Sequence, residues 1–226
     1  MFIGHYALAL AAKRAAPRTS LGTLFAAASL ADLLWPAFLL LGWEQAHVLP
    51  VPNPFLTLWL DSIPISHSLI TLIGWGALFA LFYRMRTGEG RAALVVALLV
   101  VSHWVLDFVT HRPDMPLYPG GTPLGLGLGL WNSVAGTIVV EGVMFVAGLW
   151  LYATATRARD RIGRYGFWAL IALLVLSYVG SLFSPPPPTQ VALAIGGIIF
   201  GWLFVGWAGW QDNHRETVVR RYDATL

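Results

Sequence analysis

The chain has 226 residues, of which 57% are hydrophobic and only 11% are charged, and its mean hydropathy is +0.68. Soluble domains carry about 25% charged residues, and a core of this size cannot absorb so much apolar surface. The composition therefore excludes an ordinary soluble enzyme, a disordered chain and a nucleic-acid-binding module, and it indicates a multi-pass membrane protein. Cysteine is absent, which excludes disulfides and a zinc site built from thiolates.

Six apolar segments are long enough to cross a bilayer, since a helical span needs about 20 residues at roughly 1.5 Å rise per residue. They lie near residues 20–42, 66–83, 91–110, 131–155, 165–183 and 190–210. An earlier apolar segment, residues 2–12, is too short to cross, and we expect it to form a half-helix or an interfacial piece. The sequence thus predicts one all-α membrane domain over residues 1–226: a transmembrane helix bundle of six full spans plus a short N-terminal half-helix, with a polar cytoplasmic tail at 210–226.

The basic residues predict the orientation of the chain, because Lys and Arg gather in short cytoplasmic loops. Of the 14 Lys and Arg residues, all but Arg112 fall on one side of the six predicted spans. They are Lys13, Arg14, Arg18, Arg84, Arg86, Arg91, Arg157, Arg159, Arg161, Arg164, Arg215, Arg220 and Arg221. We therefore expect a protein of the bacterial cytoplasmic membrane whose C-terminus is cytoplasmic and whose loops 43–65 and 111–130 face outward.

Ionisable residues inside the apolar segments are the candidate functional residues, because a charge at the centre of a bilayer helix costs about 2.5–3.5 kcal/mol. They are His5, Asp32, His67, His103, Asp107 and Glu141, with His111 at the edge of its segment. Counting about 1.5 Å per residue from the segment ends places these residues, from five segments, in one layer between mid-membrane and the outer face. Independent helices would not need such a layer, whereas a shared site would.

The spacing around His103 supports a metal site. His103, Asp107 and His111 follow one another at intervals of four residues, so a helix presents all three near one face. Imidazole and carboxylate together favour zinc, manganese or iron. We expect a divalent metal, with zinc first and manganese or iron as alternatives. Three further residues are expected to complete one or two metal sites: His5, Asp32 and His67.

The remaining polar residues leave alternatives open. Glu141 is a candidate further ligand or general base. Arg112 is suited to holding a phosphate or carboxylate, or to pairing with Asp114. His103 and Asp107 could instead form a hydrogen-bonded pair that joins helices, or a proton relay.

Several motifs, in this order, carry a family resemblance. They are Gly4-His5-Tyr6, Asp32-Leu33-Leu34-Trp35-Pro36, Ser66-His67-Ser68-Leu69, Ser102-His103-Trp104 with Leu106-Asp107, His111-Arg112-Pro113-Asp114, Gly127-Leu128-Gly129-Leu130-Trp131-Asn132, and Glu141. The chain resembles uncharacterised bacterial integral membrane proteins related to the predicted membrane-bound metal-dependent hydrolases. The resemblance covers most of the chain and rests on the order of the motifs, since each alone is common.

The order His, Asp, His, then His-x-x-x-Asp also resembles the ligand order of zinc-dependent phospholipase C and its nuclease relatives. That resemblance implies phosphoester hydrolysis at a dinuclear or trinuclear site. The ligands it implies are His5, Asp32, His67, His103 and Asp107, with His111 as a further one. The hydrolase family often has a His-Arg pair before its His-Ser and a second Asp after its first. Here Ser62, Ile63 and Leu34 stand at those positions, so the number of metal ions can differ.

The sequence therefore predicts a membrane-embedded metal-dependent hydrolase, with a phosphoester in a lipid or lipid-linked molecule as its substrate and a site open to the extracytoplasmic side. His111 or Glu141 would handle the proton, and Arg112 would position phosphate. The expected partners are membrane lipids and this substrate, with the oligomeric state left open.

Two alternatives remain. In a transporter or metal-handling permease the same cluster would bind an ion in transit, but the internal repeats with paired broken helices that transporters often show are not found in the sequence, which disfavours this alternative. A structural or partner-binding membrane protein would keep the metal for stability.

Overall fold

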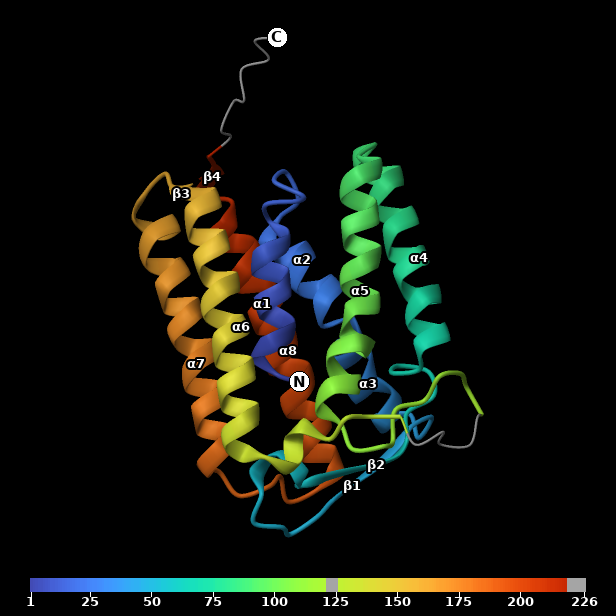
Figure 1. The fold of residues 1–226 in the computed structure, drawn as a ribbon. Coiled ribbons are helices and arrows are strands. Elements are labelled where there is room, and N and C mark those ends of the chain that lie inside the picture. Colours follow the sequence, from blue (N-terminus) through green and yellow to red (C-terminus); the bar gives the residue numbers. More distant parts are fainter. Residues whose placement is uncertain (121–125, 219–226) are drawn as a thin grey trace.

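The computed structural model describes residues 1–120 and 126–218. Within them the chain forms eight α-helices and two small antiparallel sheets (Figure 1). The helices are α1 (Ile3–Ala12), α2 (Leu21–Ala28), α3 (Leu30–Leu40), α4 (Leu69–Thr87), α5 (Gly90–Thr110), α6 (Val134–Ala155), α7 (Phe167–Phe183) and α8 (Gln190–Asp212).

Among the described residues, five helical segments are long and apolar enough to cross a membrane, and α2 with α3 makes a sixth if this bent pair is one span. The five are α4, α5, α6, the segment Ile162–Phe183 that contains α7, and α8. Their outward surfaces carry large apolar side chains such as Leu81, Val143, Leu176 and Trp202, each more than half exposed. A surface of this kind suits lipid rather than water. The predicted all-α transmembrane bundle is confirmed, and the chain is a multi-pass membrane protein.

The segment predicted as one span over 20–42 is broken at Ser29, where α2 and α3 meet at 58°. The Ser29 hydroxyl donates to the Phe25 carbonyl at 2.7 Å, and the backbone at Ser29 (φ −107°, ψ 17°) leaves the helical region. Such back-bonding by serine bends helices. The bend places Asp32 in the first turn of α3, inside the bundle.

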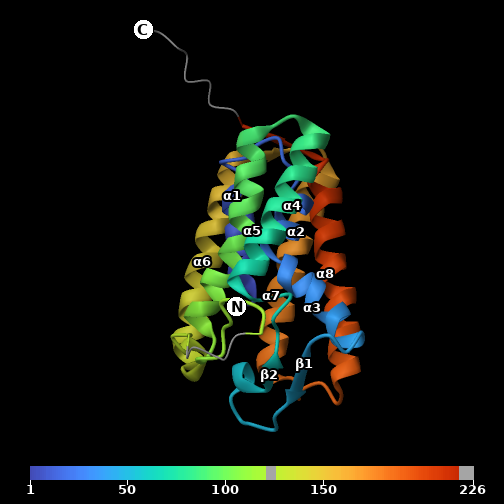
Figure 2. The same ribbon diagram turned by 90° about the vertical axis from the view of Figure 1, so that its right-hand side faces the viewer.

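The segment 2–12 forms a buried half-helix, α1, in the middle of the bundle. The N-terminus lies between the other helices in both views (Figures 1 and 2). Helix α1 contacts α2, α5 and α6. At Gly148 of α6 an added Cβ would collide with the backbone of Ala7, so only glycine permits this approach.

The two ends of the bundle differ in charge. One end carries β3 (Thr156–Ala158) and β4 (Arg215–Thr217), and we call it the basic end. Thirteen Lys and Arg residues were predicted to be cytoplasmic, and those of them that the structure describes lie at this end. Within the predicted tail 210–226, α8 continues to Asp212 and β4 pairs with β3. Arg220 and Arg221 lie outside the described residues.

The opposite end, which we call the site end, carries the sheet of β1 (Gln45–Val48) and β2 (Leu58–Ser62). Two short helical turns, Pro54–Leu56 and Leu130–Asn132, lie at the same end. Part of the loop 111–130, residues 121–125, lies outside the described residues.

Candidate metal centre

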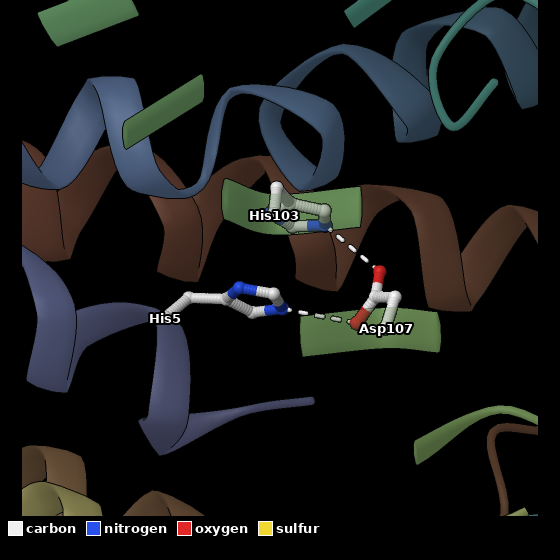
Figure 3. A group of neighbouring side chains, drawn as sticks. All are labelled: His5, His103 and Asp107. Atoms are coloured by element: carbon white, nitrogen blue, oxygen red, sulfur yellow. Dashed lines mark hydrogen bonds and ion pairs between the residues drawn. The ribbon is translucent and has the colours of Figure 1, made fainter. Parts of the chain in front are cut away.

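Asp107, in the last turns of α5, is surrounded by four imidazoles. Its Oδ1 lies 3.2 Å from Nε2 of His5, and its Oδ2 lies 3.1 Å from Nε2 of His103 (Figure 3). The Nε2 atoms of His111 and His67 lie 3.8 Å and 3.9 Å from the same Oδ2. All five side chains are buried. A single carboxylate is thus the common neighbour of four histidines from three parts of the chain.

Asp32 adds a second carboxylate to this group. Its Oδ1 lies 3.6 Å from Nε2 of His67 and 3.7 Å from Nε2 of His103, and its side chain is 47% exposed. Two groups of three residues each bring one ligand atom apiece to within 4.8 Å of one another: His5, His103 and Asp107, and Asp32, His67 and His103. Either group can hold a divalent metal ion, and His103 belongs to both.

The local structure explains why these residues meet. The four-residue spacing puts His103 and Asp107 on one face of α5, as predicted. The bend at Ser29 turns Asp32 toward that face, and α1 brings His5 so close that its ring stacks on His103 with centroids 3.7 Å apart. His67 lies just before α4, which begins after its N-cap residue Ser68.

Three of the histidines have their second ring nitrogen held by an oxygen. Nδ1 of His103 lies 2.8 Å from the carbonyl of Ala28, which can only accept, so this nitrogen carries the proton. Nδ1 of His67 lies 2.6 Å from the Ser66 hydroxyl, and Nδ1 of His111 lies 3.2 Å from Asp114. Metal-ligating histidines usually make such a bond, because it fixes the tautomer and leaves the Nε2 lone pair for the metal.

The bond at Ser66 depends on a residue that the sequence did not single out. Glu44 is fully buried, and it accepts the Ser66 hydroxyl at 2.5 Å and the backbone N–H groups of Ile65 and Ser66 at 2.7 Å and 2.8 Å. Since the hydroxyl proton goes to Glu44, the Ser66 oxygen accepts from His67. Ser66 stands in the quoted Ser66-His67-Ser68-Leu69 motif, whereas Glu44 belongs to the loop 43–65 and to none of the quoted motifs.

Unpartnered polar atoms test whether a metal fits. Among the described residues, Nε2 of His103 and Nδ1 of His5 are buried without a hydrogen-bond partner. A buried polar atom without a partner costs about 1–3 kcal/mol, so native structures rarely keep one. An ion at the Nε2 of His103 would remove that cost, and the residues present therefore fit a metal.

Glu141 holds α1 in place. Its Oε2 accepts the backbone N–H groups of Phe2 and Gly4 at 2.9 Å and 3.2 Å, while its Oε1 is buried and unpartnered among the described residues. The Met1 amine forms an ion pair with Asp107 at 2.5 Å. Glu141 therefore orients the helix that carries His5. Its predicted role as ligand or general base stays a prediction.

Arg112 borders the centre on the site end. Its Nη2 donates to the carbonyls of Leu56 and Leu58 at 3.3 Å and 3.1 Å, and its guanidinium stacks on Trp59 at 4.6 Å. Asp114, its alternative partner, bonds to His111 instead. Arg112 is thus anchored by the β1–β2 sheet and its turn.

A cavity of about 160 Å³, which we call the site cavity, adjoins the cluster, and Asp32, His67, Asp107, His111 and Arg112 are among its lining residues. Three of its lining residues carry a polar atom that is buried without a partner in the described chain: Trp35 at Nε1, Trp131 at Nε1 and Tyr178 at its OH. Arg112 places a cationic side chain on the cavity wall beside the candidate ligands.

Fold and site together define a class: a multi-pass helical membrane protein whose bundle encloses a His/Asp cluster able to hold a metal ion. Comparison of the chain with protein-family models, curated proteins and solved structures finds no match. The structure brings together His5, Asp32, His67, His103, Asp107 and His111, and it places Glu141 and Arg112 at the edge of the same cavity.

Proposed function

We propose that the protein is a membrane-embedded metal-dependent hydrolase that cleaves a phosphoester in a lipid or lipid-linked substrate, as the resemblance to the membrane-bound metal-dependent hydrolases implies. The observation that carries the proposal is the set of four histidines facing Asp107, three of them with Nδ1 fixed by an oxygen. A purely structural hydrogen-bonded pair would need one histidine rather than four.

Zinc, with manganese or iron as alternatives, suits these nitrogen and oxygen ligands, and a bound divalent ion lowers the pKa of its water to about 7. His5, Asp32, His67, His103 and Asp107 would hold it. His111 stands at the border of the cavity, with Nδ1 on Asp114 and Nε2 toward Asp107, so it is placed to accept or return a proton.

The donors around the site cavity favour an anionic substrate group. Arg112 lines the cavity, and its planar guanidinium suits the oxygens of a phosphate. Trp35, Trp131 and Tyr178 also line the cavity, and their N–H and O–H groups are buried without an acceptor among the described residues. A phosphate has enough oxygens to accept from several donors at once, which a neutral carboxylic ester has not.

The first experiment measures metal. Purified protein is loaded with zinc, desalted and analysed for its elements, and we expect stoichiometric zinc that is lost in His103→Ala. His47→Ala is the matched control, because His47 also bonds to an aspartate, Asp61 at 2.7 Å, but lies outside the cluster. Absence of metal in the loaded wild-type protein would contradict the proposal.

The second experiment measures turnover. The zinc-loaded protein in detergent is offered phospholipids and prenyl phosphates, and we expect release of phosphate or of a phosphorylated head that disappears in His103→Ala. Zinc uptake into proteoliposomes without any turnover would instead identify a metal permease.

A further inference from the structure

A second cavity, larger than the first, opens on the side of the bundle. It has a volume of about 650 Å³ and lies between α3, α7 and α8, and we call it the lateral groove. Its wall is mostly apolar, with Leu33, Leu193, Phe200 and Phe204 among its lining residues. Phe200 is 49% exposed on the outer surface of α8, so the groove opens toward the surrounding lipid.

The lateral groove adjoins the site cavity. Phe2, Asp32, Trp35 and Ser181 line both. Asp32 is the candidate ligand whose side chain is half exposed, and Trp35 bears an N–H without a partner in the described residues. An apolar space and a polar centre therefore share one wall, which is the shape that an amphiphile requires.

Glycines keep the lateral groove open. At Gly180 of α7 and Gly196 of α8 an added Cβ would meet no atom within 4 Å. By contrast, Cβ atoms at Gly197 and Gly201 would press on Pro36 and Leu33, so those two glycines serve the contact between α8 and α3. The open pair therefore has a different role from the packed pair.

The depth of the lateral groove matches a lipid tail. Helix α8 begins at the site end with Gln190, and at about 1.5 Å per residue Leu193 and Phe204 are roughly 16 Å apart along its axis. That length covers about half of a hydrocarbon core of roughly 30 Å, the extent of one leaflet.

We propose that the lateral groove binds the hydrocarbon tail of a membrane phospholipid whose phosphate lies in the site cavity, and that this lipid enters between α7 and α8. The inference rests on the proposed function, because it assigns the substrate of the same site. It commits the site to substrates with a long apolar tail and excludes small soluble phosphoesters as preferred ones.

The test fills the lateral groove. Gly196→Leu places an isobutyl group in its open space, and leucine favours the helix more than glycine does, so the variant should fold. Gly206→Leu is the matched control on the same helix, because its added Cβ also meets no atom and Gly206 does not line the groove.

Binding is measured apart from catalysis. Phosphatidylglycerol with a diazirine on its tail is added to the protein in phosphatidylcholine vesicles, and labelled peptides are identified after irradiation. We expect labelling concentrated on α3, α7 and α8, and about tenfold weaker in Gly196→Leu, as loss of contact for two methylenes predicts. Even labelling of all lipid-facing helices, unchanged in Gly196→Leu, would overturn the inference.

Turnover then separates this inference from the proposed function. We expect Gly196→Leu to raise KM for a long-chain phospholipid about tenfold, with kcat for a short-chain analogue and bound zinc unchanged. Equal loss on both substrates in Gly196→Leu would overturn the tail assignment. Absence of turnover with focused, Gly196-dependent labelling would refute the hydrolase while leaving the lipid site.

Discussion

At the scale of single residues, the centre depends on hydrogen bonds that hold its imidazoles. His67 comes from a loop before α4, and its Nδ1 is held by the Ser66 hydroxyl and, through it, by Glu44. His103, within α5, has a backbone carbonyl for the same purpose. A side-chain substitution can therefore change the orientation of His67, whereas the bond at Nδ1 of His103 goes to backbone.

Ser66→Ala should weaken metal binding. The change removes the acceptor for Nδ1 of His67 and leaves Glu44 without its hydroxyl donor, and loss of such an outer bond costs about 10–100-fold in metal affinity. Competition between the protein and a zinc chelator measures the zinc affinity of the variant. Ser102→Ala is the control, since Ser102 adjoins His103 but donates to the Leu99 carbonyl within its own helix. Equal affinities of the two variants would count against this role.

Glu141 allows a structural role to be separated from a chemical one. In Glu141→Gln one oxygen can still accept from Phe2 and Gly4, so we expect the melting temperature in detergent to stay close to that of the wild type. Glu141→Ala leaves both N–H groups without an acceptor and should lower the free energy of unfolding by about 1–3 kcal/mol. Each kcal/mol lowers the melting temperature of a chain of this size by roughly 2–4 °C. A Gln variant as unstable as the Ala variant would show that the charge, and not the acceptor, holds α1.

At the scale of elements, the cluster depends on the position of α1. Seven of its ten residues are buried, it carries His5, and it is fixed to α6 both at Glu141 and at Gly148. Ten residues form a helix that is marginal in water, so its order comes from these contacts.

Gly148→Leu should therefore displace α1 and, with it, His5. We expect a lower melting temperature and loss of bound zinc, because no side chain fits between α6 and the backbone of Ala7. Gly142→Leu on the same helix is the control, since its Cβ meets no atom within 4 Å. Elemental analysis measures the zinc bound by both variants. Zinc retained in Gly148→Leu would contradict the prediction.

At the scale of the whole molecule, the orientation of the bundle is accessible because the chain has no cysteine. Single substitutions at exposed positions, Val51→Cys at the site end and Arg161→Cys at the basic end, provide unique labels. If the positive-inside rule holds, an impermeant maleimide added to intact cells should label only the first. Labelling of Arg161→Cys alone would reverse the predicted topology.

Much of the architecture could be predicted because apolar length and charge spacing are local properties. The long helices followed from apolar length, and the common face of His103 and Asp107 followed from a spacing of four. The break at Ser29 could not be predicted, since hydropathy does not register a hydroxyl that bonds to its own helix. The bond between Glu44 and Ser66 could not be predicted either, because it depends on how the loop that carries Glu44 folds against the segment before α4.

The position of His103 in both ligand groups limits how many ions the centre can hold at once. An imidazole nitrogen has one lone pair, and Nδ1 of His103 is committed to Ala28, so only one ion can take its Nε2. If that ion were held with His5 and Asp107, a second ion would keep two residues of its own group, Asp32 and His67, and an oxygen from water or from the substrate would help to complete its shell. Occupancy by that ion and affinity for the substrate would then rise together, each strengthening the other by the same factor.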